Sequence, residues 1–435
     1  MDFITQVQET LLSHLPTIVE DYHGKTEAEN LSEMEKQVKQ MTHDLGNEVM
    51  RLWLEAQDEK YPSDQKACEC GADAKYVRRR EGMSITVQGR VYYRRAYYLC
   101  EHCQCGFYPL DRKLGIRPGE MSEEVVKLAA LLGIQEAFVP SQKVLAETTL
   151  LDLSPNSVRT ATHRIAEAIL TEEAAQIQQS QQLEAQLDRK RTDNKPQRLY
   201  GSIDGFYAML KSGGHEMKTG TWWTVNDKGK ATDIRYYVDT VRANAFSDLV
   251  WATGFKHHAD QAVELIFVAD GADWIWKIVE HHYPQAVQIV DWYHACQYIA
   301  PVAKQAFKDT SQQQAWIKQV RDDLWQGKLD KVIVACQQHV QSDLKSDEDK
   351  AQQAVTYFQN NRHRMHYPAY REQGYQIGSG TMESGCKQIG LQRLRIAGAR
   401  WSKEGVRKVA KARAAYLTDQ WSKLNLQSTT LQQVA

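Results

Sequence analysis

The fold is decided by the stretch Ile266-Phe267-Val268-Ala269-Asp270-Gly271-Ala272-Asp273-Trp274-Ile275-Trp276. Its first four residues form an apolar run of strand length, and Gly271 marks a turn before a helical pattern begins. Asp270 therefore stands at the C-terminal end of a predicted strand and just before a predicted helix. Open α/β sheets place their sites at such positions.

Further strand-like runs lie on both sides of this stretch. They cover residues 199–210, 220–225, 234–241, 265–269 and 287–290, and helical runs lie among and after them. Strands first, and then alternating helices and strands, predict a mixed sheet covered by helices. We therefore expect an α/β fold in a multi-domain chain.

Two other acids stand in similarly unusual places. Asp204 lies in the strand-like run Tyr200-Gly201-Ser202-Ile203-Asp204-Gly205, and Glu383 follows a Gly-rich turn in Gly378-Ser379-Gly380-Thr381-Met382-Glu383-Ser384-Gly385. A buried carboxylate is costly without a compensating cation. Taken singly, an Asp-Gly pair is usually a turn or a cap. Three acids from two strands and one helix, however, can hold two Mg²⁺ ions for in-line attack on a phosphodiester.

Five of the eight cysteines form two clusters, Cys68-Glu69-Cys70-Gly71 and Cys100-Glu101-His102-Cys103-Gln104-Cys105-Gly106. Two short Cys-containing turns at the ends of a hairpin can supply the four ligands of a structural zinc ion. We predict that Cys68, Cys70, Cys100 and Cys103 bind it, with Cys105 as a fifth candidate. Free or buried thiols are the alternative. The isolated Cys296, Cys336 and Cys386 are interpreted as core thiols.

Three short helical stretches follow the cysteines, at residues 121–133, 140–148 and 155–170. Ser154-Pro155 is typical of an N-cap followed by proline at the first helical position. Such a triplet can form a helix-turn-helix whose third helix enters the major groove of DNA. A plain helical bundle is the alternative.

Basic residues that suit contacts with DNA phosphate occur in three places. Residues 387–423 hold ten Lys/Arg against two Asp/Glu, a local balance of +8 in a chain of net charge −1. This imbalance indicates a polyanionic partner. A basic helix face that is exposed to solvent and binds nothing is the alternative. The candidates are Arg78, Arg79, Arg80, Arg94 and Arg95 beside the cysteines, Arg159 and Arg164 in the third helical stretch, and Lys387, Arg393, Arg395, Arg400 and Lys403 near the C-terminus.

Overall composition is that of a globular protein. The 435 residues are 42% hydrophobic and 25% charged, and no apolar run approaches the roughly 18 residues that a membrane span needs. The opening residues lack the basic segment of a secretory signal. We therefore expect neither secretion nor a membrane partner.

Together these motifs resemble the ISKra-type transposases of bacterial insertion sequences. The resemblance rests on Val268–Trp276, on Gln288-Ile289-Val290-Asp291-Trp292-Tyr293-His294-Ala295, on Gly378–Ser384 and Arg400-Trp401-Ser402, and on the cysteine clusters with Pro109-Leu110-Asp111. It spans roughly residues 65–415.

The resemblance implies a DDE transposase with an RNase H-like core. Its catalytic and metal-binding triad falls on Asp204, Asp270 and Glu383, with two Mg²⁺ (or Mn²⁺) ions per site. The run from Asp291 to His294 resembles the Asp/Cys-x-x-His signature of Mutator-like relatives. His294 would reach the scissile phosphate or orient a carboxylate, and a hydrogen-bonded core histidine is the alternative.

The same resemblance suggests the organisation of the chain and its partners. The expected partners are double-stranded DNA, as the terminal inverted repeats of the element and its target, and further copies of the chain in a dimer or larger assembly. The expected location is the bacterial cytoplasm, at the nucleoid. The predicted segments are an acidic helical region (1–60), a zinc-ribbon-like domain (61–118), a helix-turn-helix-like domain (119–171), a linker (172–198), the first part of the RNase H-like core (199–295), a helical insertion (296–372), the last core helices with a basic face (373–423) and a tail (424–435).

Two other functions fit the same residues. One is an RNase H-like nuclease that cleaves DNA without strand transfer. The other is a catalytically silent zinc-ribbon protein, derived from a transposase, that only binds DNA.

Overall fold

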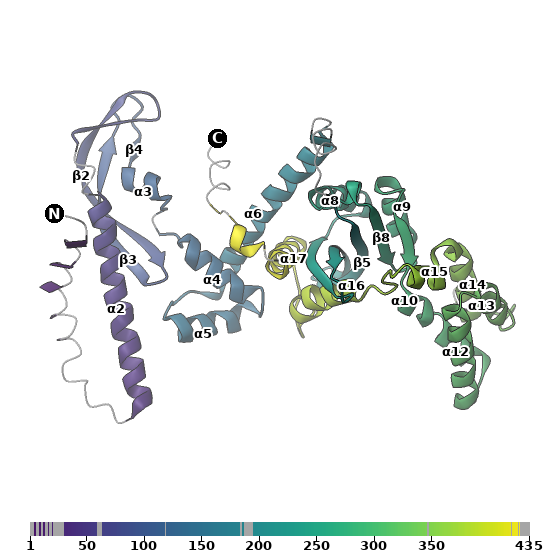
Figure 1. The fold of residues 1–435 in the computed structure, drawn as a ribbon. Coiled ribbons are helices and arrows are strands. Elements are labelled where there is room, and N and C mark those ends of the chain that lie inside the picture. The colour runs from purple at the N-terminus through teal and green to yellow at the C-terminus, as the bar shows by residue number, and fades with distance from the viewer. Residues whose placement is uncertain are drawn as a thin grey trace. The chain divides into compact units, whose positions relative to one another are not determined.

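The computed structural model describes residues 30–424 except 59–62, 118, 183–184, 187–194, 346–347 and 419, together with Leu426 and scattered positions before residue 30. The chain forms two compact units, whose elements are shown in Figure 1. The N-terminal unit comprises Met1–Ile165 with Asn425–Ala435, and the C-terminal unit comprises Ala166–Leu424. None of the described helices is long and apolar enough to cross a membrane.

The N-terminal unit contains a four-stranded antiparallel sheet. Its strands are β1 (Gln65–Ala67), β2 (Asp73–Thr86), β3 (Gly89–Leu99) and β4 (Gly106–Phe107), in the order β1-β2-β3-β4. The short helix α3 (Pro109–Leu114) follows β4. The start of β2 pairs with the end of β3, since Lys75 lies opposite Leu99, so the β1–β2 turn and the β3–β4 turn lie at the same end of the sheet.

A long helix, α2 (Leu31–Asp58), packs against β3. Leu54 of the helix is buried with Val91 and Tyr93, and the carboxylate of Asp58 accepts the backbone N–H of Ala96 at 2.9 Å. The helix is the second half of the predicted acidic region. Most of the first half lies outside the described residues.

Three helices follow, α4 (Glu123–Gly133), α5 (Phe138–Thr149) and α6 (Pro155–Gln181). Ser154 Oγ accepts the N–H of Ser157 at 3.0 Å, which confirms the predicted cap, and Pro155 begins the helix. α6 continues to Gln181, so the first part of the predicted Gln-rich linker is helical. Glutamine is a good helix former, and Ser180 is buried.

The C-terminal unit is built on a five-stranded mixed sheet. Its strands are β5 (Arg198–Leu210), β6 (Gly213–Val225), β7 (Ala231–Asp239), β8 (Glu264–Ala269) and β9 (Val287–Val290), in the order β7-β6-β5-β8-β9. Pairing is antiparallel among β7, β6 and β5, and parallel among β5, β8 and β9. This arrangement confirms the predicted mixed sheet.

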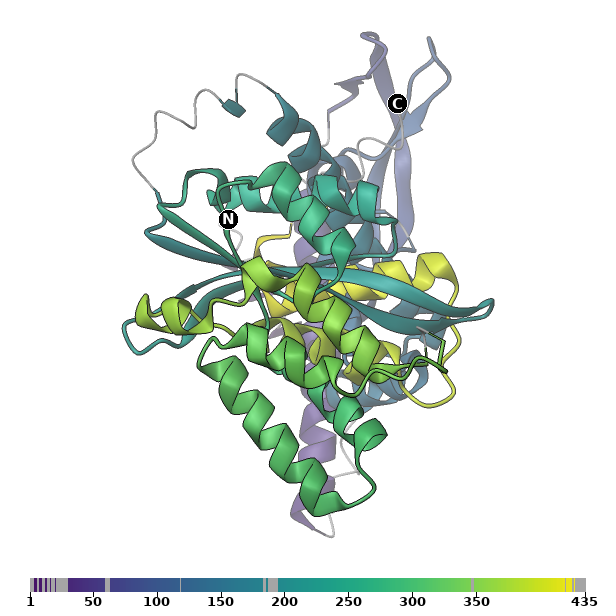
Figure 2. The same ribbon diagram turned by 90° about the vertical axis from the view of Figure 1, so that its right-hand side faces the viewer.

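Helices cover both faces of this sheet, as Figure 2 shows. α8 (Ala243–Lys256) contacts β6 and β7, whereas α16 (Gly380–Gly385) and α17 (Lys403–Leu417) contact β5 and β7. The apolar strands and α8 share a core that includes Trp222, Phe246 and Phe267. The remaining elements here are the short η1 (Ala259–Gln261), α9 (Asp273–His282), the π-helix η3 (Cys386–Leu394) and η4 (Trp421–Lys423).

The region predicted as an insertion is helical. After α10 (Trp292–Gln297) come α11 (Ile299–Ala306), α12 (Thr310–Trp325), α13 (Leu329–Gln337), α14 (Lys350–Asn360), η2 (Arg362–Arg364) and α15 (Tyr367–Glu372). Their apolar residues join the core of the sheet domain, so the insertion packs against the sheet domain as part of one hydrophobic core.

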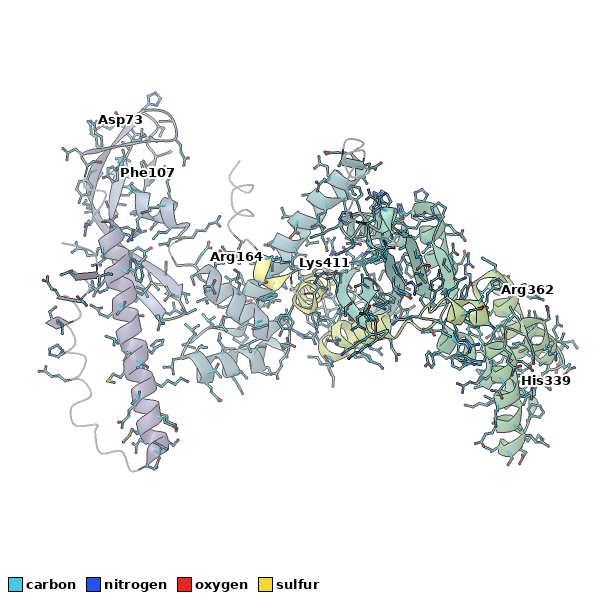
Figure 3. The ribbon with its side chains drawn as sticks, viewed as in Figure 1. Asp73, Phe107, Arg164, His339, Arg362 and Lys411 are labelled. Carbon is cyan, nitrogen blue, oxygen red and sulfur yellow. The ribbon has the colours of Figure 1, made fainter. Side chains whose placement is uncertain are left out.

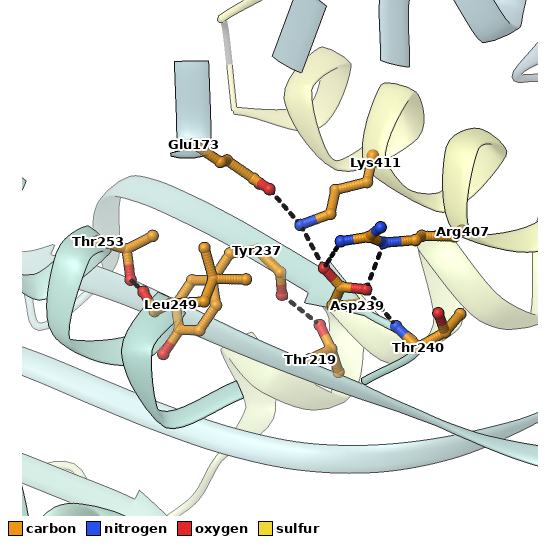
Figure 4. A network of polar contacts seen from close by, with 9 residues as sticks. All are labelled: Glu173, Thr219, Tyr237, Asp239, Thr240, Leu249, Thr253, Arg407 and Lys411. Carbon is orange, nitrogen blue, oxygen red and sulfur yellow. Dashed lines mark hydrogen bonds and ion pairs between the residues drawn. The ribbon is translucent and has the colours of Figure 1, made fainter. Parts of the chain in front are cut away.

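An ion-pair network holds α17 against α6 and β7. Lys411, which Figure 3 places on α17, is 1% exposed and pairs with Glu173 of α6 and with Asp239 of β7, the latter at 3.0 Å. Arg407 forms two further hydrogen bonds to Asp239, at 2.7 and 2.9 Å (Figure 4). Burial alone would raise the pKa of Asp239, but the nearby charges of Lys411 and Arg407 outweigh it and hold the pKa below its usual value.

Removing Lys411 is expected to destabilise the protein strongly. In Lys411→Met, Asp239 would keep only Arg407 and Glu173 would lose its ion-pair partner, and breaking a buried pair in this way costs about 3–5 kcal/mol. Urea denaturation measures the loss. Lys277→Met is the matched control, because Lys277 and its partner Asp273 are both exposed, and its unfolding curve should match that of the wild type. Equal curves for Lys411→Met and the wild type would contradict the role of the network.

Candidate active site and metal centre

The parallel pairing of β5, β8 and β9 brings three acids into one row. Gly201 of β5 pairs with Phe267 of β8, and three residues further along each strand stand Asp204 and Asp270. Ala269 of β8 pairs with Val290 of β9, and the next residue on each side is Asp270 and Asp291. Neighbouring strands lie about 4.8 Å apart. The carboxyl ends of three adjacent strands therefore present Asp204, Asp270 and Asp291 side by side.

Asp204 and Asp270 are partly buried carboxylates with little compensating charge. Asp204 accepts the N–H of Gly205 at 2.6 Å, and Asp270 accepts the N–H of Ala272 at 2.9 Å. Burial raises the pKa of both residues, and the charge of Asp270 contributes to the rise at Asp204. In the described part of the chain, neither forms an ion pair with Lys or Arg.

His294 lies within electrostatic range of these two acids. Its charge acts to lower the pKa of Asp204 and of Asp270, against the larger effect of burial. It belongs to α10, which begins directly after the third acid of the row. The predicted site therefore brings together Asp204, Asp270 and His294, from three different elements.

Asp291 is a positioning residue. It is 2% exposed, caps α10 by accepting the N–H of His294 at 2.8 Å, and also accepts the N–H of Ser379. The N–H of Trp292 donates to Ile377 at 2.9 Å alongside it. Asp291 thus links α10 to the Gly-rich segment that leads into α16. Its carboxylate oxygens accept hydrogen bonds from backbone N–H groups.

Glu383 lies on α16, apart from the other two acids. Its side chain is 64% exposed and pairs with Lys387 at 2.8 Å, one helical turn later. The link to the strands is Cys386, whose thiol lies 3.4 Å from Asp204 Oδ2. Burial, with the charges of Asp204 and Glu383, raises the pKa of this thiol. Cys386, predicted to be an ordinary core thiol, therefore stands between two of the three predicted metal ligands.

The donor set of the acids fits a hard divalent cation only in part. Asp204 and Asp270 offer carboxylate oxygens, which Mg²⁺ prefers, and their raised pKa values mark a place that lacks positive charge. The three predicted ligands do not converge: among the described residues, the cysteines alone form a group of three or more potential ligands around one metal position. Glu383 instead points into solvent, where it pairs with Lys387.

The sequence did not single out two charged residues of β6 beside the site. A Cβ on Gly205 would lie 2.7 Å from Glu216 Oε1, and the charge of Glu216 raises the pKa of Asp270. Lys218 is 7% exposed, pairs with Glu216 at 2.5 Å and lies 4.5 Å from the ring centre of Trp274. Their only signal in the sequence is the alternation of charges at the start of an otherwise apolar strand.

The four predicted zinc ligands converge at one end of the N-terminal sheet. The ligand atoms of Cys68, Cys70, Cys100 and Cys103 all lie within 4.8 Å of one another. Cys68 and Cys103 are 3.6 Å apart, as are Cys70 and Cys100. The backbone N–H of Cys103 lowers the pKa of Cys100 to about 7, which favours the thiolate that a metal needs. The structure thus confirms a set that could hold a metal ion, and exposed Cys105 is not in it.

Two of the predicted DNA-contacting residues are corrected by the structure. Arg95 is 2% exposed and pairs with Asp111 at 2.8 Å, so it stabilises the hairpin. Arg393 is 1% exposed in η3, and burial, followed by the charge of Arg413, lowers its pKa to about 10. Both side chains are withdrawn from the surface.

The other predicted DNA contacts vary in exposure. Arg79 pairs with Asp58 at 3.4 Å, Arg80 stacks on Tyr97 at 3.7 Å, and Arg164 pairs with Glu120 at 3.6 Å. The exposed members are Arg78, Arg94, Arg159, Lys387, Arg395, Arg400 and Lys403.

Comparison with known proteins identifies one family. The model of the family described as "Uncharacterised protein family (UPF0236)" matches residues 25–427. No curated protein matches the chain.

Replacing one zinc ligand is expected to remove the metal. Cys100→Ser should purify without zinc and melt at a lower temperature, because the metal organises the two turns that close the sheet. Cys105→Ser is the control and should keep one zinc ion per chain and the wild-type melting temperature. Elemental analysis and thermal melting measure both. Zinc loss in Cys105→Ser, or zinc retained in Cys100→Ser, would contradict the ligand set.

Neutralising Asp270 is expected to stabilise the metal-free protein at pH 7. Burial raises the pKa of Asp270 in the folded state above its value in the unfolded chain. The free energy of unfolding therefore falls as the pH rises from the lower of these two pKa values through the higher one. Asp270→Asn should therefore melt higher than the wild type in EDTA at pH 7, and this advantage should shrink as the pH falls towards about 4. Asp248→Asn, at an exposed position of α8, should change nothing. A lower melting temperature for Asp270→Asn than for the wild type would contradict the inference that the buried charge of Asp270 destabilises the metal-free protein.

Proposed function

We propose that this chain, which belongs to the UPF0236 family, is a DDE-type transposase that cuts and joins DNA at the ends of an insertion sequence. One observation carries the proposal. Asp204 and Asp270 are set in register on neighbouring parallel strands, partly buried and without a Lys or Arg partner among the described residues. Two carboxylates in this state are suited to binding a divalent cation.

The residues of the site take distinct parts in the proposed reaction. Asp204, Asp270 and Glu383 would hold two Mg²⁺ or Mn²⁺ ions. Such ions activate a water or a DNA 3′-hydroxyl for in-line attack and stabilise the departing oxygen. Glu383 would leave its ion pair with Lys387 and turn towards the metal ions. Lys387 would then be able to contact a DNA phosphate. Asp291 fixes α10, so that His294 is held against the acids and can orient a carboxylate or the scissile phosphate.

The proposed partner is double-stranded DNA. Exposed Lys387, Arg395, Arg400 and Lys403 lie in or after the segment that carries Glu383, where phosphate contacts would add affinity without sequence selectivity. The proposed zinc site, the helices α4 and α5, and the first part of α6 up to Ile165 belong to the N-terminal unit and would bind the terminal inverted repeats. We further propose a dimer or larger assembly on DNA, within the bacterial cytoplasm at the nucleoid.

A cleavage assay tests the proposal. The wild type is expected to nick a labelled duplex that contains an element end, in Mg²⁺ or Mn²⁺ but not in EDTA. Asp270→Asn should bind this duplex normally and lose at least about a hundredfold in cleavage rate, since a metal ligand contributes several kcal/mol to the transition state. Asp248→Asn is the matched control and should cut at the wild-type rate.

Each alternative has its own outcome in this assay. Nicking without joined products would indicate a nuclease that lacks strand transfer. Binding without any cutting would indicate a silent DNA-binding protein. Equal cutting by the wild type and by Asp270→Asn would remove Asp270 from the mechanism and overturn the proposal.

A further inference from the structure

A thiol lies against one of the carboxylates of the candidate active site. Cys386 Sγ donates a hydrogen bond to Asp204 Oδ2 over 3.4 Å, and both residues are half-buried. Cys386 is the first residue of the π-helix η3, which follows α16 directly. π-Helical turns are rare and occur frequently at functional sites. The contact joins β5 to the segment that carries Glu383, and it adds a sulfur atom to a group of oxygen donors.

Two glycines allow this segment to approach the sheet closely. A Cβ on Gly385 would lie 2.5 Å from Tyr236 Cε1, and a Cβ on Gly390 would lie 2.9 Å from Phe206 Cδ2. Both glycines are buried, and Cys386 comes directly after the first of them. The backbone on both sides of the thiol is therefore packed against β5 and β7, which holds the sulfur atom beside Asp204.

The separation of the sulfur and oxygen atoms matches that of two ligands of one cation. Zinc binds sulfur at about 2.3 Å and carboxylate oxygen at roughly 2.1 Å, so two such ligands at angles between about 90° and 109° lie roughly 3.1–3.6 Å apart. The observed 3.4 Å falls within this range. The paired sulfur atoms of the proposed zinc site are separated by a similar distance, 3.6 Å. Asp204 and Cys386 can therefore share a cation without a rearrangement of the backbone.

The types of donor distinguish between cations. Mg²⁺ prefers oxygen ligands and loses its waters reluctantly, whereas sulfur ligands favour zinc. Asp270 and His294 lie within electrostatic range of Asp204, and they offer an oxygen and a nitrogen, both of which zinc accepts. A set of donors that contains sulfur, nitrogen and oxygen fits a zinc-like cation better than it fits Mg²⁺.

We propose that Cys386 makes the site at Asp204 selective for a divalent cation of the zinc class, which binds Asp204 and Cys386 together and competes there with Mg²⁺. The cation takes the place of the thiol proton, which passes to the solvent. The competition rests on the proposed function, since it concerns the ions that Asp204 would hold during the reaction. Zinc-class cations then inhibit DNA cleavage, because they occupy the carboxylate that the catalytic ions need.

Titration with Cd²⁺ tests the inference on the DNA-free, full-length protein. Cd²⁺ is the probe because its bond to a thiolate gives an ultraviolet charge-transfer band. The wild type, Cys386→Ser and Cys296→Ser are compared after loading with zinc, so that the N-terminal cysteines contribute equally in all three. Cys296 is the matched control, since it is also half-buried in the C-terminal unit and forms no hydrogen bond to Asp204 or Asp270 in the described structure. The buffer contains no thiol and no chelator.

We expect the wild type and Cys296→Ser to show a cadmium–thiolate absorbance that Cys386→Ser lacks. The affinity for Cd²⁺ should fall at least about tenfold in Cys386→Ser, because even residues that only support a metal ligand contribute that much. The affinity for Mn²⁺, measured by the electron paramagnetic resonance of the free ion, should be equal in the three proteins, since Mn²⁺ suits oxygen ligands. In cleavage assays with Mn²⁺, Cys386→Ser should tolerate correspondingly more Cd²⁺ than the wild type.

Two results would overturn the inference. One is an equal affinity for Cd²⁺ and an equal absorbance in the wild type and Cys386→Ser. The other is a parallel loss of Mn²⁺ and Cd²⁺ affinity in Cys386→Ser, because the thiol would then shape the site without selecting a cation. Thermal melting checks that the proteins are folded. If Cys386→Ser does not fold, Cys386→Ala takes its place with the same expected results.

The two proposals fail in different ways. If Cys386→Ser binds Cd²⁺ as the wild type does, while Asp270→Asn abolishes cutting, the cation inference fails and the proposed function stands. If Cys386→Ser loses the absorbance and the affinity for Cd²⁺, but the wild type cuts no duplex, the cation site stands and the proposed function fails. Equal binding of Cd²⁺ by both proteins, together with no cutting, overturns both.

Discussion

The parallel pairing of β5 with β8, and of β8 with β9, is the constraint on which the site depends. Register in a sheet is fixed in steps of one residue, and a slip by one would turn each side chain to the opposite face. With the observed register, Asp204, Asp270 and Asp291 share one edge. Asp204 and Asp270 each accept one backbone N–H, whereas Asp291 accepts the backbone N–H groups of both His294 and Ser379. One row of acids thus provides both the proposed metal site and the hydrogen bonds that hold α10 to the segment before α16.

The three predicted metal ligands lie in two different environments. Burial disfavours the charged forms of Asp204 and Asp270, which lie at the ends of apolar strands in the core of the sheet. The remaining acid, Glu383, comes from a segment that is exposed and paired with Lys387. In the proposed reaction, the sheet supplies a rigid half of the site and the C-terminal helices supply a half that adjusts.

The sequence predicted the strands and the four cysteines well, because both signals are local. Apolar runs of strand length and short Cys-containing turns need no knowledge of distant partners. Burial by tertiary contacts was not predictable in this way. Arg95 pairs with Asp111, and the Glu216 carboxylate lies beside Gly205, only once the chain has folded. The ion pair of Glu383 with Lys387, by contrast, joins residues one helical turn apart, and such a spacing can be read from the sequence.

The most direct measurement is a crystal structure of the protein with Mn²⁺ and an element-end duplex, using the anomalous signal of manganese. The proposed function predicts a peak between the carboxylates of Asp204 and Asp270, with Glu383 turned away from Lys387 and towards the metal. A well-ordered DNA complex whose manganese peaks all lie elsewhere, with Asp204 and Asp270 free of metal, would contradict it.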